Sequence, residues 1–215
     1  MGTNQKWVSF WGDAVSVAVN RPERYAKDIT LRYPLYAPFA GSGLKLTFDN
    51  YCGTEDVIIS KVNVWYDGAI YPMYYQGERK MRIPAGERIV TDPLEISFEG
   101  GDHIDVSFYL GEFTLMRSVV YTNGPLSEGT FANGDQTEEE TIDKMISRKT
   151  QLFYFLSNAS LLTNEENRAI VCYGDSITAQ DWPDYLTIRC YNEGFRKTAV
   201  IRRATSGSRI STGLR

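Results

Sequence analysis

The stretch Ala169-Ile-Val-Cys-Tyr-Gly-Asp-Ser-Ile-Thr178 marks a change of fold class along the chain. Its first five residues form a short continuous apolar run, which is typical of a strand buried on both faces of a parallel sheet. Pro183 suits the first turn of a helix that runs from Trp182 to about Glu193, and Thr198–Arg203 has the pattern of a second strand. Strand, helix and strand in this order predict one βαβ unit.

Upstream of this unit the sequence has the pattern of strands separated by turns. Leu44–Phe48 and Ile104–Leu110 alternate apolar with polar residues, which predicts antiparallel strands with one buried face. Gln151–Leu162 is a further strand-like run. The other expected strands are Lys6–Trp11, Asp28–Tyr33, Val57–Trp65, Lys80–Ile83, Leu94–Phe98, His103–Leu110 and Phe113–Tyr121. A mainly β protein follows, with an antiparallel β-sandwich, jelly-roll-like, over residues 1–162.

One helix is expected within this β-rich part, near residues 136–150. Thr137-Glu-Glu-Glu140 offers a capping box and an acidic first turn, and Arg148 and Lys149 suit a last turn. The polar segment Thr163–Arg168 is the best domain boundary, so a second domain is expected over residues 163–215.

Composition excludes several classes of protein. The 215 residues carry a formal net charge of −4, which gives no overall positive field for a nucleic-acid backbone. No apolar run approaches the ~20 residues of a membrane span, and the N-terminus lacks the apolar core of a signal peptide. The sequence thus predicts a soluble, cytoplasmic protein without nucleic-acid or membrane partners. Cys52, Cys172 and Cys190 form no Cys-x-x-Cys pair, so we expect reduced thiols rather than disulfides or a zinc site.

Gly174-Asp-Ser176 is the candidate for chemistry. A small residue at the carboxyl end of a parallel strand lets the backbone turn sharply, which presents the Ser176 hydroxyl at the sheet edge where α/β folds hold their ligands. The following helix begins nearby, and its N–H groups favour the negative charge that develops in acyl transfer. The alternative is an ordinary strand-to-helix turn.

Context favours the chemical interpretation. Ile170-Val-Cys-Tyr-Gly-Asp-Ser-Ile-Thr178 resembles the first signature block of the SGNH/GDSL esterases and lipases, and Arg203-Ala-Thr-Ser-Gly-Ser-Arg-Ile210 is similar to the second. Segments such as Leu44-Lys-Leu-Thr-Phe-Asp-Asn50 and Ile83-Pro-Ala-Gly-Glu87 are similar to the β-sandwich that precedes the hydrolase domain in one bacterial subgroup of this family.

The resemblance implies a flavodoxin-like α/β hydrolase domain and assigns roles to four residues. Ser176 would be the nucleophile, and its own N–H with that of Gly207 would form the oxyanion hole. Gly174 and Asp175 would support the turn, with Asp175 ordering it rather than acting as a base. The implied reaction is hydrolysis of acyl or acetyl esters, including esters on carbohydrates, without a metal or organic cofactor.

The departures from the family pattern are equally informative. The Gly-x-Asn-Asp block and the Asp-x-x-His block, which supply a third oxyanion donor and the base, are absent from this sequence. The one histidine, His103, lies beside Asp102 at the start of a predicted sandwich strand. We therefore expect the N-terminal part of a longer esterase, with the hydrolase domain truncated, the chain inactive alone, and a second polypeptide able to complete it.

A non-enzymatic alternative remains, in which the sandwich binds a carbohydrate or a partner and the hydrolase remnant is vestigial. The aromatic residues that could stack on a sugar are Trp65, Tyr66, Tyr71, Tyr74 and Tyr75, although packing within the sheet explains them more simply. Glu138–Glu140 could hold a metal, but an acidic first helical turn explains them without one. Asp181 and Asp184 could line a substrate crevice. The alternative is that they cap the helix or interact with the dipole of its first turn.

Overall fold

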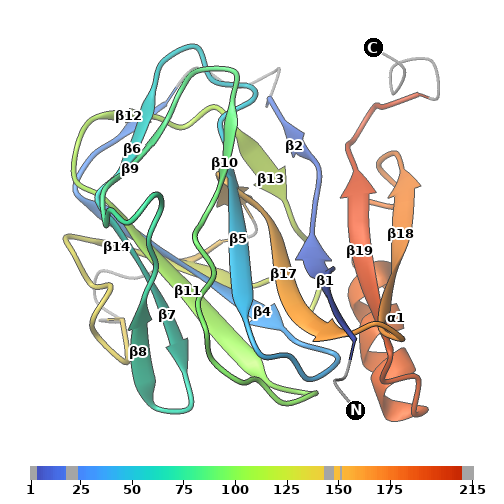
Figure 1. Cartoon of the computed structure of the whole chain (residues 1–215). Coiled ribbons are helices and arrows are strands. Elements are labelled where there is room, and N and C mark those ends of the chain that lie inside the picture. The colour runs from blue at the N-terminus through green and yellow to red at the C-terminus, as the bar shows by residue number, and fades with distance from the viewer. Residues whose placement is uncertain (1–3, 18–23, 143–147, 151, 210–215) are drawn as a thin grey trace.

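The computed structural model describes residues 4–17, 24–142, 148–150 and 152–209 (Figure 1). In this part of the chain the protein is mainly β, with nineteen strands and the helix α1 (Trp182–Asn192). No helix among these residues has the length and apolar character needed to cross a bilayer.

Two larger antiparallel sheets form most of the β-rich part (Figure 1). The first is four-stranded, in the order β1 (Gln5–Gly12), β17 (Leu156–Asn164), β5 (Leu44–Asp49) and β10 (Arg88–Val90). The second is six-stranded, in the order β15 (Arg148–Thr150), β14 (Gly129–Asn133), β4 (Ile29–Tyr36), β11 (His103–Leu110), β7 (Lys61–Tyr66) and β8 (Ala69–Pro72).

The described short strands of the β-rich part form three further small sheets. β12 (Thr114–Leu115) pairs with β3 (Tyr25–Ala26), and β6 (Val57–Ile59) pairs with β9 (Met81–Ile83). β13 (Val119–Tyr121) lies between β16 (Leu152–Tyr154) and β2 (Val15–Ser16).

The core of the β-rich part joins the two larger sheets. Alternation along β5 buries Leu44, Leu46 and Phe48 on one face, as the sequence predicts. The Phe48 ring meets Phe108 of β11 edge to face, with 5.3 Å between the ring centroids. Aromatic side chains from strands distant in sequence therefore fix how the two sheets pack.

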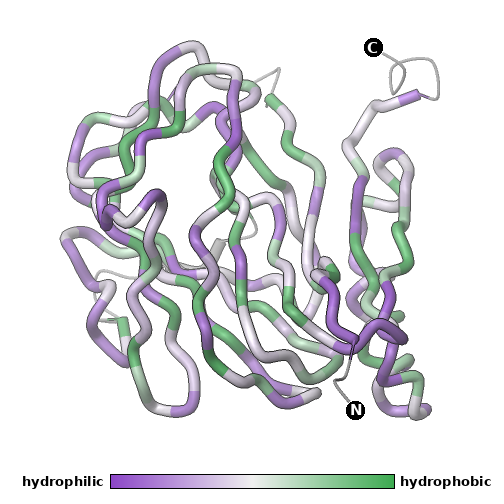
Figure 2. The backbone as a smooth tube through the Cα atoms, viewed as in Figure 1, coloured by the Kyte–Doolittle hydropathy of each residue, from purple (hydrophilic) through white to green (hydrophobic). Residues whose placement is uncertain are grey.

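The C-terminal part contains the predicted βαβ unit. β18 (Arg168–Gly174) and β19 (Thr198–Ala204) pair in parallel, from Arg168 opposite Thr198 to Gly174 opposite Ala204. Both strands contain hydrophobic stretches (Figure 2). The helix α1 connects them and ends before Gly194, whose positive φ of 87° suits a glycine. β19 packs against α1 and β1, so this strand joins the βαβ unit to the β-rich part.

The prediction of a helix near residues 136–150 is wrong for the residues of that range that the structure describes. Residues 137–142 form turns and irregular backbone, and Arg148–Thr150 form the strand β15; residues 143–147 lie outside the described residues. Asp135 Oδ1 accepts hydrogen bonds from the N–H and the hydroxyl of Thr137. Thr137, the expected helix cap, therefore stabilises a local turn instead. The nearly buried Arg32 donates to the carbonyl oxygens of Gln136, Glu139 and Glu140. These tertiary contacts override local helix propensity.

Other expectations differ at strand boundaries. Leu94–Phe98 forms only isolated bridges from its two ends, to Leu44 and Gly41, rather than a strand. The runs Val57–Trp65 and Phe113–Tyr121 each divide into two strands. β4 begins at Ile29 because Asp28 has a positive φ of 56° and turns the chain there.

Candidate active site

Two turns meet at the carboxyl ends of β18 and β19. Gly174 stands opposite Ala204 in the parallel register, so the turn after β18 lies beside the turn after β19. The Gly174 carbonyl oxygen accepts a hydrogen bond from Thr205 N–H at 3.3 Å and from Ser208 Oγ at 3.0 Å. The structure therefore places Ser176, in the first turn, and Gly207, in the second, at one edge of this sheet.

The first turn needs its glycine and uses its aspartate. A Cβ at Gly174 would lie 2.2 Å from Thr178 Oγ1 and 2.7 Å from Thr178 Cβ, so only glycine fits this close approach. Asp175 Oδ1 accepts a hydrogen bond from Ile177 N–H at 3.0 Å, and the Asp175 carbonyl oxygen accepts one from Ala179 N–H at 3.0 Å. The Asp175 carboxylate thus holds the turn in shape.

The hydrogen-bonding groups expected to act in catalysis are uncommitted. Among the described residues, the Ser176 hydroxyl and the N–H groups of Ser176 and Gly207 form no hydrogen bond. Ser176 is half-buried and Gly207 is exposed with a φ of 79°, in the left-handed region that favours glycine. Two backbone donors beside a serine hydroxyl are the elements from which an oxyanion hole is built.

His103 lies far from Ser176. Its ring contacts Tyr36, with 5.2 Å between centroids, and Tyr36 contacts Tyr191, with 5.7 Å between centroids. Tyr191 is in the last turn of α1, whereas Ser176 precedes the first turn. An eleven-residue helix is about 16 Å long at 1.5 Å per residue. His103 is therefore near the opposite end of α1 and cannot serve as the base for Ser176.

A buried charge cluster that the sequence did not reveal joins the βαβ unit to the β-rich part. Arg202 of β19 is 5% exposed and lies between two carboxylates: Asp13 Oδ2 at 3.4 Å and Asp184 Oδ1 at 3.1 Å. Its guanidinium also donates to the Asn123 carbonyl oxygen at 2.9 Å. Asp13 comes from the loop after β1 and Asp184 from the first turn of α1, so one arginine bonds three segments together.

The structure corrects the interpretation of Asp184. Its Oδ2 accepts hydrogen bonds from Leu126 N–H and Ser127 Oγ, both at 2.9 Å. The side chain is therefore directed into the contact with the β-rich part, where it lines a cavity of about 30 Å³ together with Asp13 and Arg202. Asp181 occupies the N-cap position of α1, but its side chain makes no capping hydrogen bond.

Burial raises the pKa of Asp13 from its ordinary value of 3.8 to about 7, although Arg202, the Ala14 N–H and Arg203 oppose the shift. In the unfolded chain this carboxyl loses its proton near pH 3.8, whereas in the folded protein it keeps the proton to about pH 7. The folded state therefore binds more protons in this interval, and stability falls as the pH rises from about 4 to about 7.

We expect this pH dependence to be missing in the Asp13→Asn variant. Urea unfolding of both proteins should show the free-energy difference, wild type minus variant, decreasing by up to about 1.4 kcal/mol per pH unit between pH 4 and 7. The comparison removes the contributions of other carboxyl groups, such as Asp184 and Asp49, whose pKa values burial also raises. A difference that stays constant over this pH range would contradict the assignment.

Residues weighed in the sequence for other roles are occupied in packing. Trp65 Nε1 donates to the Thr137 carbonyl oxygen at 2.9 Å, and the Arg32 guanidinium lies over the Trp65 ring. Tyr74 is partly exposed beneath Arg79. Glu138 pairs with Lys61, and the described residues contain no group of three His, Cys, Asp or Glu side chains able to hold a metal ion. Cys52, Cys172 and Cys190 are free thiols, and Cys172 is buried.

The outer strand of the βαβ unit exposes apolar side chains. β18 pairs only with β19 among the described strands, so its second edge is open. Tyr173 is 65% exposed and Ile177 72%, although strands of parallel sheets are normally buried on both faces. Ile170 and Val171 of β18 are exposed as well, as are Trp182 and Tyr185 of α1.

Comparison with known protein families and curated proteins identifies no relative of this chain. No protein-family model matches the chain, and no curated protein is significantly similar to it. The features that indicate a function are therefore the two turns and the residues that hold them.

Proposed function

We propose that this chain carries the nucleophile and part of the oxyanion hole of a serine ester hydrolase of the SGNH/GDSL type. The observation that carries the proposal is the meeting of two turns at one sheet edge, with the Ser176 hydroxyl and the N–H groups of Ser176 and Gly207 uncommitted among the described residues. The resemblance of both turns to the family's first two blocks supports the same conclusion. In this proposal the two larger sheets form a β-sandwich, and β18-α1-β19 begins a flavodoxin-like domain.

The proposed reaction is acyl transfer in two steps. A base removes the proton of Ser176 Oγ as the oxygen attacks the ester carbonyl carbon, and the carbonyl oxygen becomes an oxyanion that the N–H groups of Ser176 and Gly207 stabilise. Collapse of this intermediate expels the alcohol, which takes a proton from the base, and leaves an acyl group on Ser176. Water then attacks the acyl-enzyme in the same way and releases the acid. The substrates are acyl or acetyl esters, including those on carbohydrates.

The base must come from outside the described residues, because His103 is at the far end of α1. We propose that further polypeptide supplies a histidine and its orienting carboxylate. The open edge of β18 and the exposed side chains around it, such as Tyr173 and Ile177, offer a surface for such a segment. Covering them would bury apolar area and pair backbone groups that otherwise bond to water.

A fluorophosphonate probe tests this proposal, since it reacts only with an activated serine. The protein is purified from cells that produce it, together with any polypeptide that remains bound, and its hydrolysis of 4-nitrophenyl acetate is measured. We expect one adduct, located on Ser176 by mass spectrometry of the digested protein, and loss of hydrolysis in parallel with labelling. Hydrolysis of the ester without an adduct at Ser176 would reject the proposal.

A further inference from the structure

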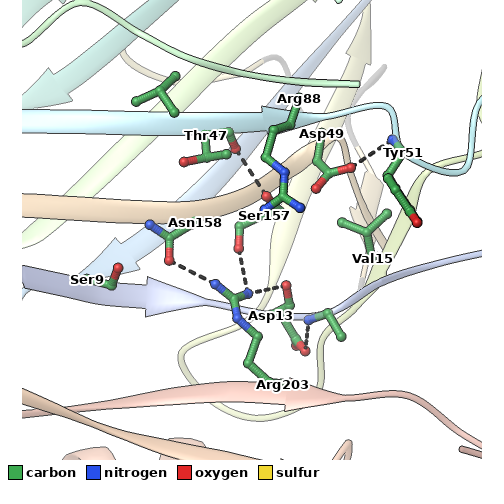
Figure 3. Close-up of a pocket in the computed structure, with 12 residues that line it drawn as sticks. Ser9, Asp13, Val15, Thr47, Asp49, Tyr51, Arg88, Ser157, Asn158 and Arg203 are labelled. Atoms are coloured by element: carbon green, nitrogen blue, oxygen red, sulfur yellow. Dashed lines mark hydrogen bonds between the residues drawn. The ribbon is translucent and has the colours of Figure 1, made fainter. Parts of the chain in front are cut away.

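A polar pocket of about 440 Å³ lies between the outer face of the four-stranded sheet and β19 (Figure 3). β1, β5, β10 and β17 contribute to its walls, and Arg203 of β19 reaches into it. The pocket therefore lies where the βαβ unit meets the β-rich part. Its volume falls in the range of small-molecule sites.

Arg203 forms a fixed floor for the pocket. Its guanidinium donates to the Asp13 carbonyl oxygen, to the Ser157 carbonyl oxygen at 3.0 Å and to Asn158 Oδ1 at 2.9 Å (Figure 3). The glycine at position 12 permits this arrangement, because a Cβ there would lie 2.8 Å from Arg203 Nη2 and from Asn158 Oδ1. These three bonds to protein oxygens hold the guanidinium in place, so Arg203 shapes the site.

The wall opposite Arg203 has polar groups that the protein leaves unused. Asp49 is nearly buried, and one of its carboxylate oxygens accepts a hydrogen bond from Tyr51 N–H at 2.8 Å. Its other oxygen, the Arg88 guanidinium and the Tyr51 hydroxyl form no hydrogen bond within the described part of the chain. Figure 3 shows Arg88, Asp49 and Tyr51 grouped on this side of the pocket. Donors and acceptors thus stand next to one another at the wall.

The two charged groups on the unused wall have opposite signs, because Arg88 is a cation and Asp49 is an anion when ionised. The Asp13 carboxylate is paired with Arg202, and the Arg203 guanidinium is bonded to three protein oxygens. A charged ligand at this wall would therefore meet one group of like charge. A purely apolar ligand would leave the buried polar groups without partners. A neutral polyol fits best, because each hydroxyl group both donates and accepts hydrogen bonds.

We propose that this pocket binds a neutral sugar residue through Arg88, Asp49 and Tyr51. Arg88 donates to a ring or hydroxyl oxygen, the free Asp49 oxygen accepts from a neighbouring hydroxyl group, and the exposed Tyr51 side chain closes one side. This site goes beyond the proposed ester hydrolysis, since binding requires neither Ser176 nor an added base. It also differs from the aromatic surface around Trp65 and Tyr74 that the sequence offered for sugars.

Calorimetric titration of the 215-residue chain with the methyl glycosides of glucose, galactose and mannose tests the site. We expect saturable binding of at least one glycoside and a loss of affinity of roughly tenfold or more in Arg88→Gln, which removes a charged hydrogen-bond donor. Tyr51→Phe, which removes only a hydroxyl group, should weaken binding less. Arg189→Gln is the matched control, because this exposed arginine lies on α1 and pairs with Glu193.

Three results would overturn the proposal. The first is that none of the three glycosides binds at concentrations up to its solubility. The second is an affinity that is unchanged in both Arg88→Gln and Tyr51→Phe, and the third is tighter binding of methyl glucuronide, an anion, than of the methyl glucoside. Ser176→Ala should bind the sugar as the wild type does. Failure of the esterase proposal and failure of this one are therefore distinguishable.

Discussion

Replacing Ser176 by alanine should abolish ester hydrolysis in any preparation of the protein that hydrolyses 4-nitrophenyl acetate. The Oγ atom forms the bond to the acyl group, so its removal leaves only the oxyanion donors and substrate binding. Loss of a serine nucleophile of this kind lowers kcat by about 10⁴–10⁶-fold. The turn itself should persist, because its hydrogen bonds come from Asp175 and Gly174 rather than from the Ser176 hydroxyl. The measurement is the steady-state rate at saturating ester.

Ser97→Ala is the matched control for this change. Ser97 is exposed and lies in a segment remote in sequence from both turns, so its variant should retain the wild-type rate. Thermal unfolding of Ser176→Ala should match that of the wild type, which separates loss of chemistry from loss of structure. A Ser176→Ala protein with more than about a tenth of the wild-type kcat would assign the nucleophile elsewhere.

Replacing Arg202 by leucine should destabilise the protein by about 3–5 kcal/mol at pH 8, the cost of removing one partner from a buried ion pair. The substitution leaves the carboxylates of Asp13 and Asp184 in the contact between β19, α1 and the β-rich part without their cation. Because the pKa of Asp13 is raised to about 7, this carboxyl is protonated at pH 5 and the penalty should be smaller there. Urea unfolding at both pH values measures the two effects.

Two variants make this test specific. Arg189→Leu removes an exposed arginine paired with Glu193 on α1 and should change stability by less than about 1 kcal/mol. Combining Arg202→Leu with Asp13→Asn and Asp184→Asn removes the unpaired charges and should recover part of the lost stability. A loss below about 1 kcal/mol for Arg202→Leu alone would show that the cluster does not hold the two parts together.

Local patterns in the sequence were enough to predict the βαβ unit and many of the strands. The apolar run of β18, Pro183 at the start of α1 and Gly194 after its end each act over a few residues, so they can be recognised without the fold. The alternation in β5 and β11 likewise reports which face is buried. The turn at Gly174 belongs to the same class, because its close contact is with Thr178, four residues away.

Contacts between distant residues decided the rest. Arg32 donates hydrogen bonds to the carbonyl oxygens of residues 136, 139 and 140, and these bonds stabilise turns where local propensity favours a helix. Arg202 joins Asp13 to Asp184, and the pocket gathers Asp49, Arg88 and Arg203 from three strands. No periodicity marks such pairs, because their energy comes from burial and charge pairing that exist only after the chain has folded. The sequence by itself thus determined the two turns with Ser176 and Gly207, and the tertiary structure alone decided how the βαβ unit docks on the sheets.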